Sequence, residues 1–104
     1  MGLAIALHVV PQMLKQWIDP AWSMLALMVI DAAVAACEEL GLPFRRMTSG
    51  AYHDAMVLAA KVPVGMLFVP SAGGISHHPD EHTDPEDIDR GVDVLAGTLA
   101  RLAA

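Results

Sequence analysis

Residues 19–43 read DPAWSMLALMVIDAAVAACEELGLP, and this stretch decides what the rest of the chain can be. Asp19 is a good helix cap, and Pro20 suits the first helical position, where no backbone N–H is needed. Gly41 provides the usual glycine exit, and a proline follows two residues later. The stretch therefore predicts a helix that begins at Pro20 and ends at about Leu40.

The first half of this predicted helix is apolar on every side. Residues 24–30 contain no polar side chain, so this part either lies between a sheet and a neighbour or stays adhesive in isolation. A membrane span from Ala21 to Cys37 is the alternative, but it is short and carries Asp31 near its middle. A buried helix is therefore favoured, and we expect no membrane partner.

Two apolar runs predict strands that are covered on both faces. Residues 3–10 are rich in β-branched side chains, residues 62–69 are apolar without alternation, and each run is followed by a proline. Between them, residues 42–47 form a short extended piece. The polar turn Thr48-Ser49-Gly50 then leads into a second predicted helix over residues 51–61.

The end of the chain carries the clearest helix pattern. Asp84 occupies the cap position, Pro85 starts the helix, and the acidic residues that follow suit the positive end of a helix dipole. Apolar side chains then recur at spacings of four, three, four and three, at Ile88, Val92, Leu95, Leu99 and Leu102. This periodicity predicts that the face formed by these residues packs on the sheet.

The order strand, helix, helix, strand, helix indicates an α/β arrangement in which two strands share a sheet that helices cover. Two strands do not make a stable sheet by themselves, so we expect the sheet to be incomplete in this chain. A length of 104 residues allows one domain at most. The chain is expected to be a piece of a larger α/β domain, or a subunit that completes its sheet with a partner.

Composition and charge narrow the possible partners. Hydrophobic residues make up 55% of the chain, which is high for a small domain, so another polypeptide or self-association is expected to cover apolar surface. The net charge of −6 offers no basic stripe for phosphates, and nucleic acid is not expected. The single cysteine, Cys37, predicts a buried structural thiol. No basic residue precedes Lys15, so a secretory signal is not supported and the cytoplasm is the expected location.

Two polar clusters interrupt the apolar sequence where α/β proteins place their ligands. One spans residues 49–55 at a predicted helix start, and the other spans residues 73–81 after a predicted strand. The spacing in the second cluster matches neither a zinc finger nor a His-Glu-x-x-His helix, which leaves open a solvated acidic loop or a single ligand to a metal held elsewhere. Its side chains that can bind a divalent metal, with the histidine that follows, are His77, His78, Asp80, Glu81 and His82.

The first cluster offers His53 and Asp54 as sequence neighbours. On a helix such neighbours point in different directions and cannot form a dyad. Ser49 lacks the glycine frame of a nucleophile elbow. These residues alone therefore do not distinguish a structural from a functional role for His53.

The two clusters taken together carry a more specific pattern. SGAYHDA at 49–55, VGMLFVP at 64–70 and GISH at 74–77 occur in order, followed by Pro79, Glu81 and Pro85-Glu86-Asp87. This order resembles the C-terminal stretch of hydantoinase/carbamoylase amidases of the M20 metallopeptidase clan, which include N-carbamoyl-L-amino-acid hydrolases, allantoate amidohydrolases and β-ureidopropionases. The resemblance implies that residues 1–104 form the C-terminal part of a metallo-amidohydrolase catalytic domain, as a partial layer of a zinc-peptidase-like fold.

The resemblance also implies roles for particular residues. His77 matches the last histidine ligand of a centre that holds two divalent metal ions, zinc or manganese. His53 matches an active-site histidine that contacts the substrate or the developing oxyanion, and Tyr52 is implied to lie against the substrate. The implied reaction is attack of metal-activated water on a carbamoyl or ureido carbonyl. The other ligands lie upstream in such enzymes, so the chain alone is expected to be inactive.

Two positions depart from the family pattern. Tyr52 stands where the motif has glycine, so its side chain would disturb a backbone that needs positive φ or a close approach to substrate. His78 stands where serine or asparagine is usual, and it could compete for the metal or face water.

A different class of function also fits the sequence. The chain could be a non-catalytic module that uses the His-rich loop to capture a metal or the apolar helix to oligomerise. A small membrane-associated protein is a third interpretation.

Overall fold

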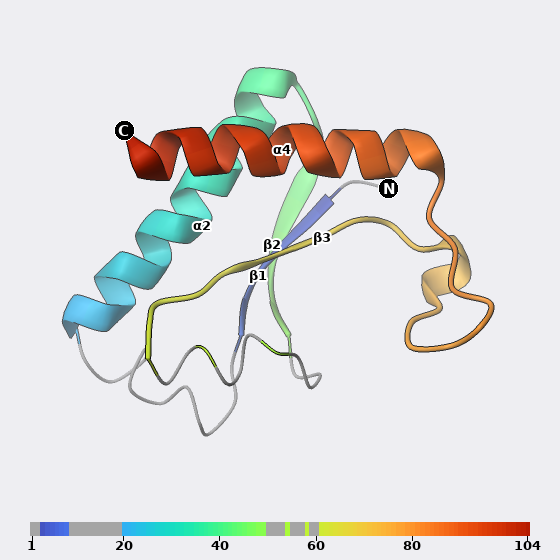
Figure 1. Ribbon diagram of the computed structural model, residues 1–104, viewed down its shortest axis with the longest axis horizontal. Helices are drawn as coiled ribbons and strands as arrows, with labels where there is room; N and C mark the ends of the chain where they lie inside the picture. Colours follow the sequence, from blue (N-terminus) through green and yellow to red (C-terminus); the bar gives the residue numbers. More distant parts are fainter. Residues whose placement is uncertain (1–2, 9–19, 50–53, 55–57, 59–60) are drawn as a thin grey trace.

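The computed structural model describes residues 3–8, 20–49, 54, 58 and 61–104. The elements in chain order are strand β1 (Leu3–His8), helix α2 (Pro20–Leu40), strands β2 (Phe44–Ser49) and β3 (Met66–Phe68), the 3-10 turn η2 (Ala72–Gly74) and helix α4 (Pro85–Ala103) (Figure 1). The mixed composition of helices and strands agrees with the predicted α/β class. The helix predicted over residues 51–61 lies largely outside the described residues.

The strands form one mixed sheet in the order β2-β1-β3. β1 runs parallel to β2, with Leu3 opposite Phe44, and antiparallel to β3, with Ile5 opposite Leu67. β1 thus lies at the centre, as expected for an apolar strand. α2 is the crossover that a pair of parallel strands requires.

Two predictions about the strands are wrong. Most of the piece predicted only as extended over residues 42–47 belongs to β2, which also includes Thr48 and Ser49 of the predicted polar turn, so the described sheet has three strands and not two. The sequence of β2, FRRMTS, is polar enough for an edge strand but contains no apolar run. The strand predicted over residues 62–69 is confined to Met66–Phe68 and lies at an edge of the described sheet. Pro63 and Gly65, which disfavour strand structure, account for the shorter length.

α2 ends where the sequence predicts. Gly41 adopts the left-handed conformation, with a φ of 68°. Its N–H donates to the Glu38 carbonyl at 3.1 Å, and the Leu42 N–H donates to the Cys37 carbonyl at 2.9 Å. These are the paired bonds of a Schellman cap, and they turn the chain into β2.

One face of α2 fills the core between the sheet and α4. The buried hydrophobic residues are Leu3, Ala26, Ile30, Ala33, Val34, Ala36, Cys37 and Val94, and Leu42, Phe44, Leu67 and Val69 pack against them. The opposite side of the first half of α2 is exposed, at Met24, Leu25, Leu27 and Met28. The sequence left open whether this apolar half lies between a sheet and a neighbour or keeps an exposed apolar side. In the described part of the chain, it keeps an exposed apolar side. None of the described helices is long and apolar enough to span a membrane.

The packed face of α4 is not the predicted one. Its buried residues are Gly91, Val94 and Thr98, and the Thr98 hydroxyl is satisfied by donating to the Val94 carbonyl at 2.7 Å. The five residues predicted to pack on the sheet are instead 42% to 58% exposed. We call this exposed set the outer stripe: Ile88, Val92, Leu95, Leu99 and Leu102.

Small residues explain which face of α4 packs. A Cβ added at Gly91 would lie 2.6 Å from Cγ1 of Val69, and one added at Gly97 would lie 3.2 Å from Cβ of Ala36. α4 therefore approaches the end of β3 and α2 more closely than a face of leucines would permit. The regular periodicity of the outer stripe marks a second apolar face of the same helix.

Because of this packing, the smaller side chain of Val94 should contribute more to the free energy of unfolding than the larger one of Leu99. Val94→Ala should lower the free energy of unfolding by about 1–3 kcal/mol, because it removes fully buried methyl groups. Leu99→Ala should change it by less than about 0.5 kcal/mol, because Leu99 is exposed. Urea denaturation of the purified chain at low concentration checks both values, and a larger loss for Leu99→Ala would contradict the assignment of faces.

Cys37 is a free thiol that is fully buried in the core, as the sequence predicts. Burial raises the pKa of the Cys37 thiol above its ordinary value of 9.0, and the negative charge of Glu38 raises it further. The folded protein therefore holds the thiol protonated and poorly nucleophilic.

The raised pKa of Cys37 has a consequence for stability. As the pH rises above 9.0, the unfolded thiol ionises while the folded one keeps its proton, so the free energy of unfolding should fall by up to about 1.4 kcal/mol per pH unit. Urea denaturation on either side of that pH measures the slope. Cys37→Ala is the control that isolates the thiol from other titrating groups, and an equal slope in the variant would contradict the assignment.

Candidate functional site

The histidine loop, residues 71–83, connects β3 to α4 and carries the second polar cluster. It opens with η2, where Gly73 and Gly74 have φ values of 65° and 69°. Side chains oppose this left-handed conformation, and glycine adopts it freely. Residues 72–82 are exposed, and Ser71 and Thr83 at the two ends are half-buried.

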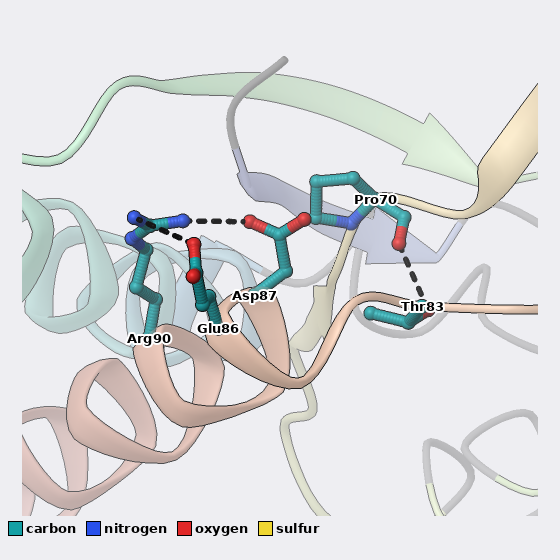
Figure 2. Close-up of polar contacts among 5 residues, drawn as sticks. All are labelled: Pro70, Thr83, Glu86, Asp87 and Arg90. Atoms are coloured by element: carbon teal, nitrogen blue, oxygen red, sulfur yellow. Dashed lines mark hydrogen bonds and ion pairs between the residues drawn. The ribbon is translucent and has the colours of Figure 1, made fainter.

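Two hydrogen bonds close the histidine loop at its base. The Ala72 N–H donates to the His82 carbonyl at 2.8 Å. The Thr83 hydroxyl donates to the Pro70 carbonyl, also at 2.8 Å, as Figure 2 shows. Both bonds join the beginning of the loop to its end, so the base is held together and the tip projects from the fold.

His77 has an unusual backbone. Among the described residues it is the one non-glycine residue with a positive φ, at 57°. This conformation is uncommon for a histidine and costs on the order of 1 kcal/mol or more. Its Nδ1 lies 2.6 Å from the Ser76 hydroxyl oxygen, a hydrogen bond that orients the ring. Residues in such conformations cluster at functional sites, which supports a functional hypothesis for His77.

The other imidazoles of the loop turn to separate neighbours. The Asp80 N–H donates to His78 Nδ1 at 3.1 Å, and His82 Nε2 lies 3.3 Å from Asp84 Oδ1. Within the described ranges, no three His, Cys, Asp or Glu side chains are grouped so that they could hold a metal ion. The described part of the histidine loop is therefore not a complete metal centre.

The first polar cluster lies mostly outside the described residues. Tyr52 and His53 are among the residues outside, so the predicted pocket shared by His53 and His77 stays a prediction. Asp54 is exposed, and its carbonyl accepts the Leu58 N–H at 3.4 Å, as in a helical turn.

The sheet topology determines at which end of the sheet each polar cluster begins. β2 ends at Ser49, which pairs with His8, whereas β3 ends at Phe68, which pairs with Ala4. The polar clusters thus follow strands that end at opposite ends of β1. The histidine loop therefore begins at the end of the sheet opposite to the one where β2 ends.

Sequence reasoning missed a hollow beside the histidine loop. It lies between the starts of β1 and β2 and the first residues of the loop, and Arg45 is its charged side chain. The two adjacent arginines of β2 were the available signal, but they differ in role, because Arg46 is ion-paired with Asp31 at 2.8 Å. The residues that line the hollow are Leu3, Pro43, Phe44, Arg45, Met47, Phe68, Val69, Pro70, Ser71 and Gly74.

The charges that begin α4 serve the helix itself. Asp84 is at the cap position, but its side chain makes no capping bond. Arg90 lies 3.0 Å from Asp87 and 3.9 Å from Glu86 (Figure 2). Ion pairs of this kind on a helix surface contribute about 0.5 kcal/mol each, so they stabilise the first turns and do not define a site.

Comparison with known proteins identifies the class. Residues 19–101 match the family model described as peptidase family M20/M25/M40, and the chain therefore belongs to this family. The chain is 45% identical over 75 residues to ureidoglycolate hydrolase of Oryza sativa subsp. japonica, and 40% identical over 87 residues to allantoate amidohydrolase of Escherichia coli (strain K12). A crystal structure of an amidase of the hydantoinase/carbamoylase family from Burkholderia multivorans matches with a TM-score of 0.66 at 43% identity.

These matches cover most of this chain but a small part of the relatives. They span 72%, 84% and 71% of this chain, and 16%, 21% and 18% of the rice, E. coli and Burkholderia proteins. The family resemblance drawn from the ordered motifs is confirmed, and the relatives' names show a family of enzymes. The chain spans about a fifth or less of the length of the relatives it matches.

The base of the histidine loop can be tested without touching a histidine. Thr83→Val removes the hydroxyl that donates to Pro70 and should cost about 1 kcal/mol, whereas Thr83→Ser retains the donor. Hydrogen exchange at the Ala72 amide should quicken about fivefold in the valine variant. Equal exchange in the valine and serine variants would show that this bond does not hold the base.

Proposed function

We propose that residues 1–104 form the C-terminal part of the catalytic domain of a hydrolase that acts on linear amide C–N bonds of carbamoyl or ureido compounds. The observation that carries the proposal is the left-handed His77 on a closed, exposed loop, within the stretch that matches the M20 family. Relatives named ureidoglycolate hydrolase and allantoate amidohydrolase support this substrate class.

The proposed roles follow the family pattern residue by residue. His77 provides one ligand to a divalent metal, zinc or manganese, that would activate water and polarise the carbonyl. His53 stabilises negative charge that develops on the carbonyl oxygen, and Tyr52 and His53 contact the substrate. The described residues do not supply a full set of ligands, so the remaining ligands must come from outside them.

The contacts of the loop argue against a metal-capture module. Capture would require several imidazoles to converge, but those of His77, His78 and His82 each bond to a neighbour in sequence. The cytoplasm remains the proposed location.

Metal binding and turnover by the purified chain test this proposal. A complete structural zinc site contributes about 10–16 kcal/mol, whereas one imidazole should give a dissociation constant weaker than about 10 µM. Calorimetry should show that His77→Ala abolishes this weak binding, while the matched neighbour His78→Ala retains it. No hydrolysis of allantoate, ureidoglycolate or carbamoyl amino acids is expected with zinc, manganese or cobalt added.

Two results would count against the proposal. Tight zinc binding that requires His77, His78 and His82 together would favour the capture module. Robust turnover by the chain alone would show that its site is complete.

A further inference from the structure

The outer stripe is an exposed apolar surface of the described structure that the proposed site does not use. Its residues are Ile88, Val92, Leu95, Leu99 and Leu102, with exposed fractions from 42% to 58%. Single exposed hydrophobic residues are ordinary on protein surfaces, but a continuous row along a helix marks an interaction surface. The spacing of four and three residues is that of a seam between packed helices.

The outer stripe is distinct from the face that α4 already packs. With 3.6 residues per turn, its centre lies roughly a quarter turn around the helix from Val94 and Thr98. The exposed charged residues Asp89, Arg90 and Asp93 occupy the remaining side. From Val94 through the outer stripe, apolar side chains of α4 span about 160° of its circumference, which is wider than the roughly 100° of a stripe that faces one core. The α2 and β3 layer packs on one part of this span, and the outer stripe, the other part, is exposed.

Helix α2, beside α4, also exposes more apolar side chains than its packing on the core uses. Met24, Leu25, Leu27 and Met28 of α2 are 47% to 66% exposed. β2 and β3 are also the outer strands of the described sheet. A second copy that paired through the outer stripe would cover that stripe. It would leave the apolar side of α2 and the two outer strands uncovered.

The family comparison indicates a different occupant. The matched region of the family includes the whole outer stripe except Leu102, and in relatives this region is accompanied by about four-fifths of a longer chain. We propose that the outer stripe is the surface on which the remaining polypeptide of an M20 catalytic domain packs, through an apolar helical face. This inference rests on the proposed function, because it takes the chain to be part of such a domain.

Co-expression tests the outer stripe directly. The tagged 104-residue chain is produced with E. coli allantoate amidohydrolase from which the segment matching this chain is deleted. A one-to-one complex is expected by size-exclusion chromatography with light scattering. Leu95→Asp and Leu99→Asp should each weaken it at least tenfold. Ala100→Asp, which adds the same charge at an exposed position on the charged side of α4, should change it less than twofold.

The controls separate folding, pairing and catalysis. The circular dichroism and thermal unfolding of the isolated Leu99→Asp chain should match those of the unsubstituted chain. Absence of a complex, a complex indifferent to both leucine variants, or a homodimer that Leu99→Asp dissociates would each overturn the inference. Allantoate turnover by the complex is measured separately: a stripe-dependent complex without turnover upholds the packing surface and counts against the proposed function.

Discussion

The close packing of α4 on α2 and on the end of β3 is the contact on which the rest of the structure depends. Gly91 and Gly97 let the helix approach, and Val94 fills the space between them. Because α4 follows the histidine loop directly, this contact fixes one end of the loop, and β3 fixes the other. The same contact determines which side of α4 is left facing outward, so the site region and the outer stripe have a common structural origin.

Much of the architecture could be predicted from local chemistry. The limits of α2 follow from Pro20 and Gly41, and the burial of Cys37 follows from its position on an apolar helix. β2 could not be recognised as a sheet strand, because FRRMTS pairs through its backbone and carries no apolar run. The packed face of α4 could not be predicted either, since periodicity identifies apolar faces without saying which one meets which neighbour. Gly91 and Thr98 gave too weak a hydropathy signal to compete with the leucines.

For the candidate site, the sequence indicated which residue to consider but not how the side chains are arranged. His77 drew attention through the order of motifs around it, and its left-handed backbone is a geometric observation that supports the same residue. The separation of the three imidazoles could not be foreseen, because composition shows which ligands are present but not where they point. Arg45 was overlooked for a related reason: its interest comes from the hollow beside it, which β1, β2 and the segment from Phe68 to Gly74 form together.

The hydrogen-bonded base of the histidine loop has an implication for how this region could change over time. The bonds of Ala72 and Thr83 close a ring of backbone, and residues 72–82 within it are exposed. Residues could be inserted or deleted between His78 and Glu81 without altering the path of the strand before or the helix after. The length of this loop is therefore set independently of the strand and the helix that hold its two ends.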